Sequence, residues 1–133
     1  MAWQVQVAYA AAMLIFGVSH AVQPRLWADF FLAMKRTGFA SLIIGMYTVP
    51  FALVIVIGHN RWNWDWPLFI TISGWGMMIK SIVYLVLPKL SERIIINPGR
   101  FGTHCGLFRV AGAFMVVVGG ILSWNAFRSF PAL

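Results

Sequence analysis

The sequence predicts an all-α membrane protein in which four transmembrane helices form two tandem parallel-repeat helical hairpins. Three observations predict this fold class. Of the 133 residues, 61% are hydrophobic and only 10% are charged, which is more apolar surface than a soluble core of this size needs. The apolar residues gather into four stretches, and the two halves of the chain resemble each other. We expect one transmembrane domain, residues 1–133, with hairpin repeats at about 3–58 and 67–126.

Each apolar stretch is close to the roughly 20 residues that cross the hydrocarbon layer of a bilayer. The stretches are Trp3–Gln23, Gly38–Gly58, Pro67–Leu87 and Cys105–Ala126. The first has no basic residue before it and no small-x-small cleavage site, so it does not read as a cleavable signal peptide. We expect all four to be membrane-spanning helices.

The linkers between the spans differ in charge. The first, residues 25–37, and the third, residues 89–104, carry most of the basic residues, whereas the middle linker has only Arg61 against Asp65. Short loops rich in Lys and Arg stay in the cytoplasm. We therefore expect a multi-pass protein of the cell inner membrane, with both termini and the middle linker on the periplasmic or exterior side.

The net charge of +7 would suggest nucleic acid in a soluble protein, but here the charges lie beside the spans. We expect both basic linkers to lie on the membrane surface as short amphipathic helices. Their Lys and Arg side chains would bind anionic phospholipid. This predicted lipid- or anion-binding set, together with Lys80, is Arg25, Lys35, Arg36, Lys89, Arg93, Arg100 and Arg109.

Matching residues recur 64 positions apart, as in Pro24 with Pro88 and Arg36 with Arg100. Each proline ends a spanning helix, because proline lacks an N–H and restricts the residue before it. Two spans per repeat insert both repeats in the same direction, related by an axis along the membrane normal. The alternative is chance similarity between two hydrophobic hairpins.

Lys80 is the strongest candidate for a functional residue inside a span. It lies about 5 Å on the cytoplasmic side of the midpoint of the third span, at 1.5 Å per residue. A charge there requires a partner or a wet path. The partner could be Asp29, Glu92, a helix-terminal carbonyl or an anionic ligand such as a lipid phosphate. The alternative is that Lys80 extends toward the inner headgroups.

Two histidines are weak candidates for metal or haem ligands. His20 and His104 lie at similar depth near the cytoplasmic side, and Cys105 follows His104. Facing imidazoles could hold a b-type haem, but shared depth is the only support, and hydrogen-bonded interfacial histidines are the simpler interpretation. His59 and Asn60 follow the second span, where we expect His59 to cap the helix. We expect no metal and no cofactor.

The middle linker contains three alternating tryptophans, Trp62, Trp64 and Trp66. In an extended segment they would share one side. They would then anchor the hairpin at the outer membrane interface, or provide a docking surface for a partner subunit.

This region resembles a family of small bacterial four-span membrane proteins without an assigned activity. The resemblance is specific over Gly58–Pro88, about a quarter of the chain. It implies the fold but no reaction, and it favours a role for Lys80 and the tryptophan-rich linker. The residues that carry it are His59, Asn60, Trp62, Trp64, Trp66, Thr71, Gly74, Trp75 and Lys80.

The predicted function is therefore non-catalytic. The sequence has no GxSxG or HExxH motif and no acidic residue within a span, which disfavours familiar enzyme types and proton-driven transport. We expect an accessory or structural subunit of a larger membrane assembly, in contact with membrane lipids and other membrane protein subunits. One alternative is a small homo-oligomeric transporter or channel that uses Lys80. A second is a haem-binding redox protein that uses His20 and His104.

Overall fold

A computed structural model describes residues 1–94 and 105–129 of the chain. In this part the chain folds into α1 (Ala2–Val22), α2 (Pro24–Arg36), α3 (Ala40–Gly58), α4 (Leu68–Val86), α5 (Pro88–Ile94) and α7 (Cys105–Arg128). Four of these, α1, α3, α4 and α7, are long and apolar enough to cross a membrane. The all-α fold class with four transmembrane helices is confirmed, and every span begins and ends within two residues of its predicted bounds.

The chain turns in the same way at the two prolines. Gln23 has φ −122° and ψ 52°, and Leu87 has φ −125° and ψ 57°. Each of these residues still donates its N–H to a carbonyl four residues earlier, at 2.9 Å in both cases. The prolines that follow begin new helices, α2 and α5, because a proline at the first helical position loses no hydrogen bond. The 64-residue repeat is therefore also a repeat of backbone geometry.

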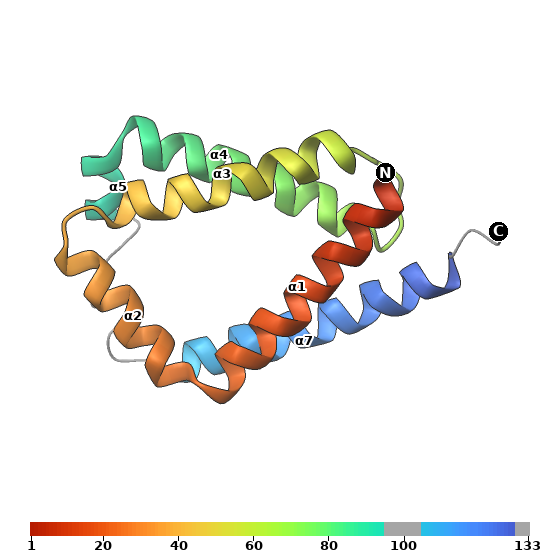
Figure 1. The fold of residues 1–133 in the computed structure, drawn as a ribbon, viewed down its shortest axis with the longest axis horizontal. Helices are drawn as coiled ribbons and strands as arrows, with labels where there is room; N and C mark the ends of the chain where they lie inside the picture. The colour runs from red at the N-terminus through yellow and green to blue at the C-terminus, as the bar shows by residue number, and fades with distance from the viewer. Residues whose placement is uncertain (95–104, 130–133) are drawn as a thin grey trace.

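The spanning helices form two antiparallel pairs, α1 with α7 and α3 with α4 (Figure 1). Each helix thus packs most extensively against a helix of the other predicted hairpin. The repeat relates α1 to α4 and α3 to α7, so it also relates one pair to the other. The amphipathic helices follow the same rule, since α2 contacts α7 and α5 contacts α3. An internal two-fold relation with parallel repeats accounts for this arrangement.

Small residues lie at the point where α1 crosses α7. A Cβ at Gly112 would lie 2.6 Å from the Gly17 carbonyl oxygen and 2.5 Å from the Ala21 backbone nitrogen. In the second pair, Thr48 and Ser81 hydrogen-bond through their hydroxyls. Ser81 follows Gly17, and Gly112 follows Thr48, by 64 positions. The repeat relation therefore holds at the level of single contacts.

All four spanning helices meet in one hydrophobic cluster at the end that holds the N-terminus. Its buried members are Val5 and Ala10 from α1, Ile55 from α3, Ile70 from α4 and Leu122 from α7. Away from this cluster the two pairs diverge, and α2 extends across the distance between them (Figure 1).

A second cluster forms where α2 meets the α3/α4 pair, and it buries Met34, Ala40 and Tyr84. The bundle is closed by its own spanning helices at one end and by an amphipathic helix at the other. We call these the outer end and the basic end, after the predicted topology and the charges described next.

Candidate functional site

The amphipathic helix α2 has three distinct faces. Ala28 and Met34 are buried against the bundle, while Arg25, Asp29 and Arg36 are exposed together on another side. Between these two faces lie the exposed apolar side chains Leu26 and Phe30. A helix with adjacent apolar and basic surfaces suits the interface between headgroups and acyl chains.

The structure brings the described basic candidates to one end of the bundle. Arg25 and Arg36 lie on α2, Lys89 and Arg93 on α5, and Arg109 in the second turn of α7, and all five are exposed. Lys35, also on α2, is half-buried. The candidate Arg100 lies outside the described residues. Because α1 and α4 end here and α3 and α7 begin here, these charges surround the ends of all four spans.

Lys80 points along α4 toward this same end. Its Nζ lies 5.4 Å from the centroid of the Tyr84 ring, one helical turn closer to the basic end. An ammonium group over the face of an aromatic ring is attracted by the ring quadrupole. Tyr84 itself is buried against α3. The predicted carboxylate partners, Asp29 and Glu92, lie on α2 and α5.

His20 belongs to an aromatic cluster that joins α1, α2 and α7. Its ring stacks on Trp27 at a centroid distance of 4.0 Å and approaches Phe108 at 6.0 Å. Its Nδ1 lies 2.7 Å from the Phe16 carbonyl oxygen, and the indole of Trp27 donates to the Ser19 hydroxyl at 2.9 Å. These contacts give His20 a packing role where α2 leaves α1.

The second haem candidate, His104, lies outside the described residues. Cys105 is half-buried at the start of α7. Within residues 1–94 and 105–129, no three His, Cys, Asp or Glu side chains come together as metal ligands.

The residues that carry the family resemblance lie together at the outer end, between α3 and α4. His59 ends α3 and donates its N–H to the Ile55 carbonyl at 2.7 Å, which confirms it as a cap. The Thr71 hydroxyl lies 2.9 Å from both the His59 and the Arg61 carbonyl oxygens. It therefore fixes the path by which the chain leaves the helix.

Asn60 and Gly74 complete this cluster. The Asn60 side-chain oxygen accepts indole N–H groups from Trp62 at 2.9 Å and from Trp75 at 3.3 Å. A Cβ at Gly74 would lie only 2.4 Å from the Cγ2 atom of Ile55, so only glycine lets α3 and α4 approach here. The motif residues thus build the outer turn. Lys80 is the exception, because it lies toward the other end of α4.

The imidazole of His59 is fully buried. Its Nδ1 lies 3.3 Å from the Thr71 hydroxyl, and its Nε2 has no hydrogen-bond partner among the described residues. Burial lowers the pKa of His59, and the charge of Arg61 lowers it further, while Asp65 opposes both effects. The ring is therefore held neutral at physiological pH.

The extended segment in which the three linker tryptophans would share one side does not form, because residues 63–67 make bends and turns. Trp62 turns back to Asn60. Trp64, which is 99% exposed, and Trp66 line a groove of about 480 Å³ that also contacts the end of α7 at Leu122 and Asn125.

The sequence analysis did not identify two buried polar residues, Gln6 and Tyr84. Gln6 is buried and donates to the Leu122 carbonyl at 3.3 Å and to the Asn125 side-chain oxygen at 3.0 Å. It is one of two amides, with Gln4, in the mostly apolar first turns of α1, which was the available signal. Tyr84, which connects Lys80 to the second cluster, gave no such signal because tyrosine is common near membrane interfaces.

No protein-family model, curated protein or solved structure matches the chain.

Proposed function

We propose that this protein is a non-catalytic accessory subunit of a membrane assembly that contacts anionic phospholipid at its basic end. In this proposal the basic end faces the cytoplasm of a bacterial cell, and both termini lie on the other side of the inner membrane. The supporting observation is the gathering of exposed Lys and Arg side chains around the ends of all four spans, next to the apolar stripe of α2.

The physical argument rests on two effects that act at the same depth. Leu26 and Phe30 are exposed on α2, and burying their side chains among acyl chains favours membrane contact. The adjacent arginines then meet the headgroups, where each basic residue contributes about 1 kcal/mol with anionic lipid. Zwitterionic lipid offers no such gain, so the proposal predicts a preference for phosphatidylglycerol or cardiolipin.

Charge-matched variants test the lipid part of the proposal. The double variant R25Q/R36Q removes two exposed arginines from α2, and R61Q/R128Q removes two exposed arginines near the other end of the bundle. We expect the first variant to retain less anionic phospholipid per chain after detergent purification, and the second to match the parent. Phosphorus analysis with lipid mass spectrometry measures this, and equal loss in both variants would contradict the proposal.

The subunit part is tested separately. Crosslinking in native membranes, followed by purification and mass spectrometry, should recover a defined partner protein in constant ratio to this chain. A chain that is recovered alone after crosslinking would contradict a role as a subunit.

A further inference from the structure

The groove at the outer end lies between the two helix pairs. Its walls are the first turns of α4 and the second half of α7, and the middle linker forms its rim with Trp64, Asp65 and Trp66. Its volume of about 480 Å³ falls within the range of about 300–1,000 Å³ that small-molecule sites occupy. Both wall helices are long and apolar enough to cross a membrane, so lipid is the molecule that surrounds this groove.

The groove is polar at one end and apolar at the other. On α7, Asn125 lies nearest the outer end, and Leu122 and Val118 follow toward the middle of the helix. On the other wall, Asp65 precedes α4 and Ile72 lies further inward. Asn125 and Val118 are seven residues apart, or about 10 Å at 1.5 Å per residue. A matching occupant carries its polar group at the outer end and an apolar chain below it, as a phospholipid does.

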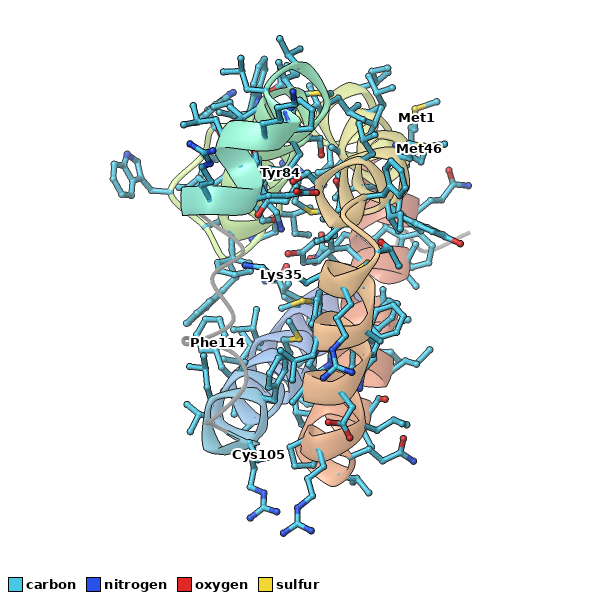
Figure 2. The ribbon with its side chains drawn as sticks, turned by 90° about the vertical axis from the view of Figure 1, so that its left-hand side faces the viewer. Met1, Lys35, Met46, Tyr84, Cys105 and Phe114 are labelled. Carbon is cyan, nitrogen blue, oxygen red and sulfur yellow. The ribbon has the colours of Figure 1, made fainter. Side chains whose placement is uncertain are left out.

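The apolar floor of the groove is built from side chains that the fold already holds in place. Phe69 contacts Phe114 of α7 at a centroid distance of 6.3 Å, and Phe114 lies between the two helix pairs when the molecule is viewed from the basic end (Figure 2). Phe69 and Val118 also pack against the buried cluster that contains Leu122. The groove opens to its surroundings at Ile72, which is 55% exposed.

The polar end of the groove contains one negative charge and one amide. Asp65 is exposed, and in the part of the chain that the structure describes its carboxylate has no ion pair or hydrogen bond. The other two acidic residues, Asp29 and Glu92, lie at the basic end on α2 and α5. The Asn125 side-chain oxygen accepts a hydrogen bond from Gln6, which leaves its NH₂ group to donate. An anionic acceptor beside a neutral donor complements a headgroup that carries an ammonium group and a phosphate.

We propose that the groove binds one phosphatidylethanolamine molecule, with its ammonium group on Asp65, its phosphate near Asn125 and an acyl chain along Leu122 and Val118. A primary ammonium donates charge-assisted hydrogen bonds to a carboxylate, which are about twice as strong as neutral ones. The trimethylated nitrogen of phosphatidylcholine has the same charge but no N–H to donate. The site requires only that α4 and α7 span the bilayer, so it does not rest on the proposed function.

Native mass spectrometry of the purified full chain tests the headgroup assignment. The chain is titrated with phosphatidylethanolamine or phosphatidylcholine of identical acyl chains, which present the same phosphate to every other part of the protein. We expect one phosphatidylethanolamine per chain, bound about tenfold or more tightly than phosphatidylcholine, as expected for one charge-assisted contact. D65N should remove this preference. The matched control D29N, which neutralises an exposed carboxylate at the basic end, should keep it.

A second pair of variants tests the place of the acyl chain. I72W puts a bulky ring into the groove, whereas I79W makes the same change about two turns further along α4, at a residue that does not line the groove. The two isoleucines are 55% and 61% exposed, so neither change overpacks the core. We expect loss of the one-to-one phosphatidylethanolamine species in I72W and binding equal to the parent in I79W.

Several results would overturn the proposal. Phosphatidylcholine that binds as tightly as phosphatidylethanolamine, or more tightly, would assign the headgroup to the faces of Trp64 and Trp66, since aromatic rings bind quaternary ammonium groups. A preference that survives D65N, or equal binding by I72W and I79W, would remove the lipid from this groove. A lipid-free species of two chains that I72W dissociates and I79W does not would assign the groove to a second copy of the chain.

Discussion

The buried histidine at the outer turn, His59, makes the stability of the fold depend on pH. His59 caps α3 through its backbone, and its imidazole contacts Thr71 in the interior. A neutral ring can stay there, whereas a charged ring would lose its hydration, a cost that the charge of Asp65 only partly offsets. The Nε2 atom has no hydrogen-bond partner within residues 1–94 and 105–129, which increases this cost, since protonation adds a second donor that needs a partner.

Protonation of His59 should therefore destabilise the fold in acid. Its folded pKa is lowered below the ordinary value of 6.5, so the unfolded chain binds the proton more tightly. The stability contribution is complete above about pH 6.5 and is lost as pH falls through the lowered folded value, by at most about 1.4 kcal/mol per pH unit.

Thermal unfolding in detergent, from about pH 7.5 to about pH 5.5, measures this effect. We expect the melting temperature of the parent to fall across this range and that of H59Q to fall less steeply. Parallel curves for the two proteins would show that another group controls the dependence.

Sequence alone predicted part of this site. His59 as a cap followed from its position after an apolar stretch, and the hydrogen bond to Ile55 confirms it. Its burial against Thr71 was not predictable, because it depends on how α3 and α4 cross. The contacts of Asn60 were not predictable either, because its side-chain oxygen accepts hydrogen bonds from the indoles of Trp62 and Trp75, which lie on different segments.

At the scale of elements, the α1/α7 pair depends on close backbone approach at glycine. Lipid gives little hydrophobic drive for helices to associate, so packing of small residues supplies much of the contact. At Gly112 the two nearest atoms belong to the backbone of α1, which cannot move aside as a flexible side chain could.

The variant Gly112→Ala should therefore weaken the α1/α7 pair by about 1–3 kcal/mol, the usual cost of overpacking. Gly120→Ala is the matched control, because a Cβ at Gly120 meets nothing within 4 Å. Both lie on α7 and both gain one methyl group. Resistance to SDS-induced unfolding measures the difference, and equal resistance would contradict a packing role for Gly112.

The elements themselves were largely predictable. Four apolar stretches and two proline breaks specified the spans and the start of each amphipathic helix to within two residues. The conformation of the middle linker was harder to predict. Its alternating tryptophans suggested an extended segment, whereas the chain turns at Asp65.

At the scale of the whole molecule, the chain pairs α1 with α7, which are far apart in the sequence. This pairing predicts that Gln6→Cys with Asn125→Cys, in a chain that also carries C105S, will be joined within one molecule by a short thiol crosslinker, since the native side chains lie 3.0 Å apart.

The control pair combines Gln6→Cys with Arg109→Cys, which lies 16 residues or about 24 Å further along α7. A gel shift of the monomer is expected only for the first pair. Crosslinks that form solely between chains would mean that α1 takes its partner from another copy.

This pairing could not have been read from the sequence. Hydropathy identifies which segments enter the membrane, but all four have similar apolar surfaces and differ chiefly in where the small and polar residues fall. Gly17 and Gly112, or Gln6 and Asn125, are recognisable as partners only after the helices are placed.

The hydrogen bond from Trp3 to the Ala126 carbonyl joins residues 123 positions apart, and it has a consequence for biosynthesis. Helix α1 leaves the ribosome well before α7 and must wait in the bilayer until α7 has been translated. In the meantime α3 and α4, which are consecutive spans, can already associate. A nascent chain halted before α7 would therefore hold one finished half of the bundle beside a solitary helix, open to membrane quality-control proteases.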